Sequence, residues 1–169
     1  MRHAIRLTVI LLSCGLVASC RTPVQDGGRS VDRVLEELVA LERSALDRWI
    51  TLDPRGYLDL QAPEVTYFDP FTERRVDGLD AMRVRTEPMR SMKPPFTDPR
   101  YEMINPKVQR HGDIALLTFN LVNYGTLNGS ERVVARWNST EVYSRIGDTW
   151  KIIHSHWSFT QPEIKPPAS

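Results

Sequence analysis

The sequence predicts an α+β fold in which helices come first and a long antiparallel sheet follows. Residues 30–52 carry apolar side chains at intervals of three and four, which is the spacing of an amphipathic helix. From residue 101 onward, segments rich in β-branched and aromatic residues alternate with short glycine-containing turns, as in strands joined by hairpins. This order is typical of an α+β domain whose curved sheet wraps around the first helix.

Three helical segments are predicted in the first part of the chain. Ser30 can cap the first helix. The apolar positions of this helix are Val31, Val34, Leu35, Leu38, Leu41, Ala45, Trp49 and Leu52. An Asp-Pro pair at 53–54 then opens a short second helix that carries Tyr57. A third helical segment over residues 79–90 is disturbed by Pro88, because proline lacks the N–H that a helix needs.

One short strand and four longer strands are predicted. The short strand covers residues 65–68 and ends at Asp69, which precedes a proline. The longer strands cover residues 101–108, 114–124, 132–146 and 149–159. The turns that separate them are His111-Gly112-Asp113, Asn128-Gly129 and Gly147-Asp148. Because these turns stand at hairpin positions, the four strands should form an antiparallel meander.

The amino terminus has the features of a bacterial export signal. It begins with basic residues, and its apolar stretch at 7–17 is too short to span a bilayer as a mature helix. Small residues directly precede Cys20, and this segment resembles the bacterial lipobox, whose cysteine is acylated before cleavage. We therefore expect a lipoprotein signal peptide at 1–19, a lipid on Cys20 and a flexible tether at 20–29. Two alternatives are an ordinary signal peptide that is cut nearby and a buried amino-terminal helix.

The rest of the chain is long enough for one compact domain. We place this domain at residues 30–161, followed by a proline-rich tail at 162–169. A lipid on Cys20 would anchor the domain in the cell envelope. In a Gram-negative host, the anchor would lie at the periplasmic face of the outer membrane, because Arg21 rather than aspartate follows the cysteine; this step depends on the resemblance to lipoproteins.

Charge balance and cysteine content argue against several classes of function. The 22 Lys and Arg residues are balanced by 21 Asp and Glu residues, so we expect no nucleic-acid partner. Of the two cysteines, Cys14 would leave with the signal peptide and Cys20 would carry lipid. No thiol then remains for a disulfide, a zinc site or thiol catalysis.

Two segments near the carboxyl terminus resemble a known family. Residues 138–145 (Asn-Ser-Thr-Glu-Val-Tyr-Ser-Arg) and 150–158 (Trp-Lys-Ile-Ile-His-Ser-His-Trp-Ser) resemble the end of the association domain of calcium/calmodulin-dependent protein kinase II and its bacterial SnoaL-like relatives. The likeness extends over about residues 31–160. It implies a cone-shaped, nuclear transport factor 2-like (cystatin-like) fold that encloses a pocket and often dimerises through the outer face of its sheet. It implies no single function, since this fold hosts isomerases, dehydratases, cyclases, assembly hubs and ligand binders.

Asp69 is the first candidate catalytic residue. It follows an apolar strand, so its carboxylate could lie at the mouth of the pocket with little water around it, which suits a general base. Its position is similar to that of the proton-shuttling aspartate in ketosteroid isomerases. However, Ala45 stands where those enzymes place a tyrosine donor, and Glu141 or Thr140 falls near their protonated acid. The alternative is that Asp69 only caps the turn before Pro70.

His154 and His156 are the other candidate catalytic residues. They alternate with Ser155 in a strand, so we expect both imidazoles on one face together with Ile152, directed into the cone. The pair could polarise a ligand carbonyl or shuttle a proton. A metal site would need a third ligand, and none stands at a recognisable spacing, so we expect no metal and no cofactor. The alternative is a hydrogen-bonded structural pair.

Five further residues are candidates for the pocket. They are Trp49, Tyr57, Asn120, Glu141 and Tyr143. Packing in the core is the alternative role for the aromatic members of this set. Asn120 and Glu141 fall where the kinase association domain carries arginines, so the resemblance does not imply an anion site at these positions.

Three interpretations of function follow. The leading one is an exported, lipid-anchored domain that binds a small, partly apolar molecule in its cone or acts as an assembly module. The alternative is a proton-transfer enzyme, an isomerase or dehydratase that uses Asp69 with His154 or His156. A third is a purely structural dimer with a filled cone. In each case we expect a homodimer, because the predicted helices are too few to cover both faces of the sheet.

Overall fold

The computed structural model describes residues 27–160. The helices are α1 (Gly27–Trp49), α2 (Arg55–Leu60) and α3 (Leu79–Thr86), and a 3-10 helix, η1 (Glu87–Ser91), continues α3. The strands are β1 (Gln61–Phe68), β2 (Val76–Asp77), β3 (Thr97–His111), β4 (Ile114–Leu127), β5 (Ser130–Ile146) and β6 (Thr149–Phe159). The predicted signal peptide, Cys20, most of the tether and the tail lie outside the described residues. Within the described part, no helix is long and apolar enough to cross a membrane.

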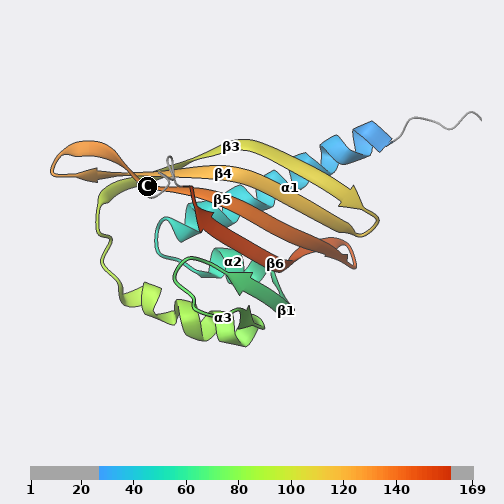
Figure 1. The fold of residues 1–169 in the computed structure, drawn as a ribbon, viewed down its shortest axis with the longest axis horizontal. Coiled ribbons are helices and arrows are strands. Elements are labelled where there is room, and N and C mark those ends of the chain that lie inside the picture. Colours follow the sequence, from blue (N-terminus) through green and yellow to red (C-terminus); the bar gives the residue numbers. More distant parts are fainter. Residues whose placement is uncertain (1–26, 161–169) are drawn as a thin grey trace, which may run out of the picture.

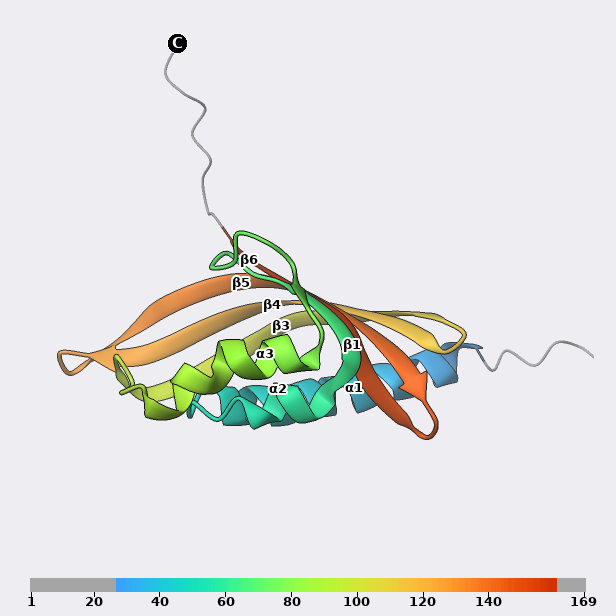
Figure 2. The same ribbon diagram turned by 90° about the horizontal axis from the view of Figure 1, so that it is seen from below.

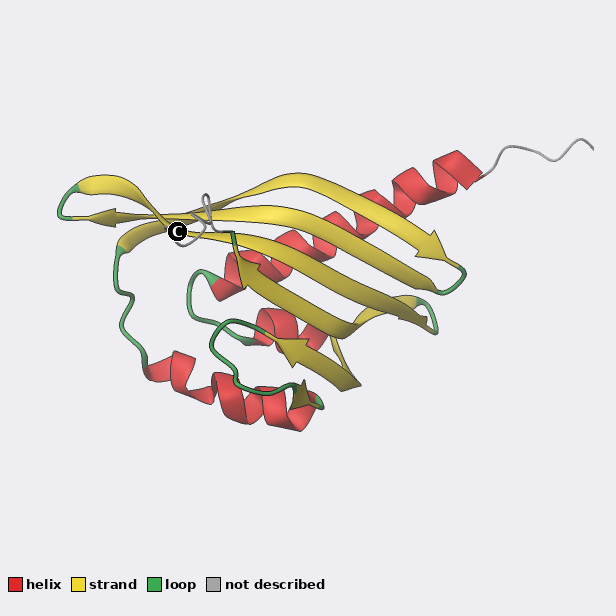
Figure 3. Ribbon diagram, in the orientation of Figure 1, coloured by secondary structure: helices red, strands yellow, loops and turns green. Residues whose placement is uncertain are grey.

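The strands form one curved sheet with the order β2-β1-β6-β5-β4-β3 (Figures 1 and 3). Strands β3 to β6 form the predicted antiparallel meander. Strand β1 pairs with β6 in the parallel direction, which the sequence did not indicate. This pairing places Phe68, at the end of β1, directly beside His156.

All three helices lie on the concave side of the sheet, and within residues 27–160 no helix covers the other side (Figure 2). The core fills the space between α1 and the sheet and includes Leu38, Leu46, Val65, Leu117 and Ile152, each at most 2% exposed. The α+β class and the helix wrapped by a curved sheet are thus as predicted.

The short helix α2 lies close against α1 because residue 56 is glycine. A Cβ atom at Gly56 would lie 2.7 Å from the carbonyl oxygen of Ala45 and 2.9 Å from its Cα. Such distances are too short for a real side-chain contact. The contact therefore sets the position of the next residue, Tyr57, over the inner side of α1.

A β-bulge in β6 changes which side chains face the core. Val142 pairs with His154, and the next residue of β5, Tyr143, pairs with Ile152, so Ile153 is an extra residue in β6. A bulge of this kind interrupts the regular alternation of a strand. Ile152 faces inward before the bulge, and after it the inward positions fall on odd-numbered residues.

Candidate functional site

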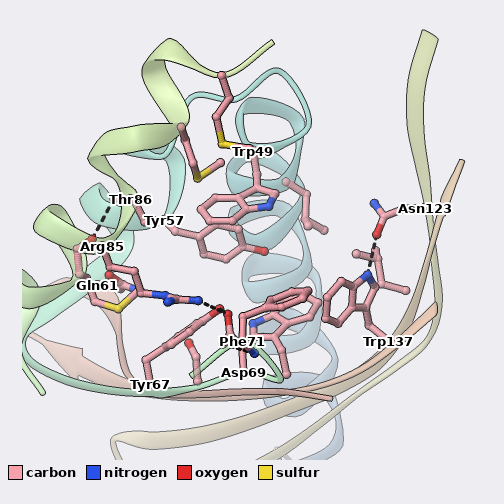
Figure 4. Close-up of a pocket in the computed structure, with 17 residues that line it drawn as sticks. Trp49, Tyr57, Gln61, Tyr67, Asp69, Phe71, Arg85, Thr86, Asn123 and Trp137 are labelled. Carbon is pink, nitrogen blue, oxygen red and sulfur yellow. Dashed lines mark hydrogen bonds and ion pairs between the residues drawn. The ribbon is translucent and has the colours of Figure 1, made fainter. Parts of the chain in front are cut away.

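A cavity of about 420 Å³ lies between the concave face of the sheet and the helices (Figure 4). Its aromatic walls comprise Trp49, Tyr57, Tyr67, Phe71, Trp137 and Trp157. Three methionines, Met82, Met89 and Met92, line it from α3, η1 and the segment that follows. Its polar residues are Gln61, Asp69, Arg85, Thr86, Asn123 and Ser155. An apolar cavity with a few polar groups is the usual form of a small-molecule site.

Aromatic contacts form a row that leads from the rim of the cavity to its interior. Phe71 is 68% exposed at the rim and contacts Trp137, with ring centroids 6.3 Å apart. Trp137 contacts Trp157 at 6.1 Å, and Trp157 contacts Tyr57 at 6.4 Å. Tyr57 in turn contacts Trp49, on α1, at 5.6 Å. A flat ligand would therefore meet aromatic side chains along the whole depth of the cavity.

Asp69 lies in the cavity, and donors already surround its carboxylate. Oδ1 accepts the backbone N–H of Phe71 at 2.9 Å, which is the turn-capping contact. Oδ2 accepts the hydroxyl of Tyr67 at 3.0 Å and Nη2 of Arg85 at 2.5 Å. The side chain of Asp69 is 7% exposed and that of Arg85 is 30% exposed. Asp69 therefore lines the cavity, where its carboxylate is held as a structural cap and ion pair rather than left free as a base.

A second group of polar residues is buried beneath the cavity. Glu42 of α1 accepts a hydrogen bond from Tyr57 at 2.6 Å and another from Tyr143 at 2.5 Å. Glu141 of β5 accepts hydrogen bonds from Ser139 and Ser155. Both carboxyl groups are fully buried.

Burial changes the protonation of both acids. It raises the pKa of Glu42 to about 7, although the hydrogen bonds from the two tyrosines act in the opposite direction. Burial and, after it, the charge of Glu42 raise the pKa of Glu141 well above its usual range. A buried pair of this kind avoids carrying two negative charges. Glu141 and Tyr143, both predicted for the pocket, therefore lie behind its wall, where Tyr57 and Ser155 separate the acids from the cavity.

The two histidines lie on the outer face of the sheet, contrary to the prediction that they face the cone. The bulge at Ile153 is the reason, because it places Ser155 inward and His154 and His156 outward. Nδ1 of His154 lies 2.7 Å from the hydroxyl oxygen of Thr66, also on the outer face. Burial lowers the pKa of His154, with smaller effects from neighbouring positive charges. His154 therefore matches the hydrogen-bonded alternative, whereas His156 contacts the ring of Phe68, with ring centroids 5.9 Å apart.

Asn120 also lies on the outer face and not in the pocket. It donates from Nδ2 to Oδ1 of Asn138, its neighbour on β5, at 2.7 Å. Of the five residues predicted for the pocket, Trp49 and Tyr57 line it directly.

Sequence reasoning missed two important charged residues. Arg85 comes from α3, and nothing in its local sequence indicates that it meets Asp69. Glu42 could have been found, because it stands four residues after Leu38 and four before Leu46, on the apolar face of the first helix. A carboxylate at such a position predicts a buried acid with hydrogen-bond partners.

Comparison with known proteins gives the family. The model of the calcium/calmodulin-dependent protein kinase II association domain matches residues 35–161. A protein from Parabacteroides distasonis, provisionally named a ketosteroid isomerase, is 38% identical with a TM-score of 0.62, covering 76% of this chain and 89% of its own. No curated protein was found to be similar.

More distant structures share the fold. The kinase II hub homology domain of Chlamydomonas reinhardtii is 23% identical, with a TM-score of 0.65 over 76% of this chain and 99% of its own. A nuclear transport factor 2-like protein from Salmonella enterica is 17% identical, with a TM-score of 0.63 over 82% of this chain and 99% of its own. The chain therefore belongs to the calcium/calmodulin-dependent protein kinase II association domain family and has the nuclear transport factor 2-like fold.

Proposed function

We propose that this protein binds a small, partly apolar molecule in the cavity beneath its curved sheet. The observation that carries the proposal is the cavity of about 420 Å³ with its continuous aromatic row. The volume lies within the range of about 300–1,000 Å³ that is usual for small-molecule sites. A purely structural domain would gain stability by filling such a space with its own side chains.

The binding of an uncharged apolar dye tests this proposal. N-phenyl-1-naphthylamine, whose fluorescence increases in apolar surroundings, should bind the wild-type protein. Met89→Trp places a bulky indole at the cavity wall and should abolish the increase. Val84→Trp is the matched control, because Val84 is 77% exposed and does not line the cavity. Equal dye binding by the two variants would refute the proposal.

The geometry gives less support to a proton-transfer enzyme. A general base needs a lone pair that can reach the proton of its substrate. Asp69 instead accepts three hydrogen bonds, one of them from a guanidinium group. His154 and His156, its predicted partners, lie on the opposite face of the sheet. The named catalytic set is therefore not assembled in one place.

Self-association is a second proposed function, and the outer face of the sheet favours it. Across β4, β5 and β6, this face carries three rows of side chains without Asp, Glu, Lys or Arg. The rows are Leu116, Val142 and His154; Thr118, Thr140 and His156; and Asn120, Asn138 and Ser158. Depletion of charge is typical of the centre of a protein interface. Solved relatives are named as hub and association domains.

A charge at the centre of this face tests self-association. Thr140→Arg should lower the molar mass measured by light scattering or sedimentation at micromolar concentration. Ser130→Arg, at the exposed first residue of β5 next to the turn, is the control and should leave the mass unchanged. A wild-type protein that is already monomeric would refute this function and leave the pocket proposal intact.

We also propose that the domain is exported and anchored in the cell envelope through a lipid on Cys20. The basic, apolar and small residues that precede the cysteine support this location. The predicted tether to residue 29 is too long, because α1 begins at Gly27; the residues between Cys20 and Gly27 would hold the pocket-bearing domain near the membrane surface.

A further inference from the structure

The hydrogen bonds already made inside the cavity limit what a ligand can find there. The hydroxyl groups of Tyr57, Tyr67 and Ser155 all donate to buried or capped carboxyl groups of the protein. The oxygens of Asp69 accept three hydrogen bonds, as described above. Thr86 donates its hydroxyl to the backbone carbonyl of Met82. Each of these four hydroxyl groups has used its only proton, so none of them can donate a hydrogen bond to a ligand, although its oxygen can still accept one.

Arg85 and Asn123 are cavity side chains that still have N–H groups to donate. A guanidinium has five N–H groups, and Arg85 uses Nη2 for Asp69 but has no other side-chain partner among residues 31–160. Asn123 accepts the indole N–H of Trp137 at 2.8 Å, and its amide nitrogen has no partner in the same region. The oxygen of Gln61 lacks a partner but is itself buried, so it is not an accessible acceptor.

Of the two partners in the ion pair, Arg85 is more accessible to a ligand than Asp69 is. The side chain of Arg85 is 30% exposed, whereas that of Asp69 is 7% exposed. In Figure 4, Arg85 extends from α3 into the cavity, and its guanidinium points at Asp69. The guanidinium also lies over the ring of Tyr67, 5.6 Å from its centroid. A ligand therefore meets a positioned guanidinium group before it can reach the carboxylate.

We propose that the ligand class is an aromatic carboxylate, whose carboxylate group binds Arg85 and whose ring lies against the aromatic row. This inference rests on the proposed binding function and specifies its ligand. A planar guanidinium matches a carboxylate in charge and in geometry. An ammonium ligand would instead have to displace Arg85 from Asp69. The free amide nitrogen of Asn123 offers a second donor to an oxygen of the ligand.

Three probes with the same ring system test the charge preference. Calorimetric titration would compare 2-naphthoate, the neutral 2-naphthamide and the cationic 2-naphthylmethylammonium on the intact protein. We expect wild type to bind naphthoate most tightly. Arg85→Gln should weaken naphthoate binding roughly ten- to a hundredfold, which is the effect of losing a charge-assisted hydrogen bond. Binding of naphthamide should change less than threefold.

A substitution at Asp69 should change the affinity for naphthoate in the opposite direction. Asp69→Asn keeps an oxygen for the N–H of Phe71 but removes the negative charge beside Arg85, so naphthoate should bind more tightly than to wild type. The double variant Asp69→Asn, Arg85→Gln leaves no unpaired charge, which keeps the test valid if Arg85→Gln alone fails to fold. It should bind naphthoate and naphthamide with similar affinity.

The outcomes separate the two levels of the proposal. If naphthamide or the ammonium probe binds wild type as tightly as naphthoate does, the carboxylate inference is wrong and the binding function stands. Weaker naphthoate binding by Asp69→Asn would also overturn the inference. If none of the three probes binds wild type and N-phenyl-1-naphthylamine also fails to bind, the proposed function itself is refuted.

Discussion

Replacing the two buried acids, Glu42 and Glu141, by glutamine tests whether their burial controls stability as a function of pH. The pKa of Glu42 is about 7 in the folded protein, against an ordinary value of 4.5. Because this pKa is raised on folding, the stability that the protonated form provides is fully present below about pH 4.5. It is lost as the pH rises through about 7. The fold should therefore become less stable between pH 5 and pH 8.

The size of the loss follows from the two pKa values. Each pKa unit between the folded and unfolded states corresponds to about 1.4 kcal/mol. For Glu42 alone, the free energy of unfolding should fall by about 2.5 kcal/mol between about pH 5 and pH 8. Glu141, whose pKa burial also raises, adds a loss of the same sign. Glutamine has nearly the same shape as glutamate and carries no charge at any pH.

Urea denaturation followed by tryptophan fluorescence at several pH values measures this effect. The double variant Glu42→Gln, Glu141→Gln is the reference, because each single variant leaves one buried acid that still titrates. The lowered pKa of His154 makes the fold more stable as the pH rises, but this contribution is the same in wild type and in the variants. The reasoning would be refuted if wild type and the double variant lost the same free energy of unfolding between pH 5 and pH 8.

Two further predictions concern packing and export. Gly56→Ala should lower the free energy of unfolding by roughly 1–3 kcal/mol, because the new methyl group would overlap the carbonyl of Ala45. Urea denaturation checks this, and unchanged stability would show that α2 can move away from α1. Cys20→Ser should leave the export signal uncleaved and without lipid, which mass spectrometry of the amino-terminal peptide detects. A variant at Cys20 that is still processed and remains membrane-bound would contradict the proposed anchor.

The fold was largely predictable because its signals are local. The amphipathic spacing of the first helix and the alternation of the long strands can be read within short windows of sequence. The turn at Asn128 and Gly129 illustrates the point, since both residues have positive φ angles, 52° and 75°, as a two-residue hairpin requires. The parallel pairing of β1 with β6 was not predictable in this way, because it joins segments about 90 residues apart.

The positions of the histidines depended on a feature that the local sequence does not reveal. Strict alternation from Ile152, which is buried, would have placed His154 and His156 inside the cone. The extra residue at Ile153 reverses this assignment. The bulge turns Ser155 inward, where its hydroxyl donates a hydrogen bond to the carboxyl group of Glu141. A shift by one residue in a strand exchanges its two faces, so one bulge moved both histidines out of the predicted site.

The chemistry of the pocket depends on a pair of residues that only the tertiary fold brings together. Asp69 directly follows β1, and Arg85 stands 16 positions later on α3, with β2 and its loops between them. From the sequence, Asp69 alone looks like an acid beside an apolar pocket, and a base is a reasonable interpretation. Once Arg85 occupies its oxygen, the same carboxylate instead holds a guanidinium in position. The charge that a ligand meets in this cavity is therefore that of Arg85, and the site is suited to bind an anion rather than to remove a proton.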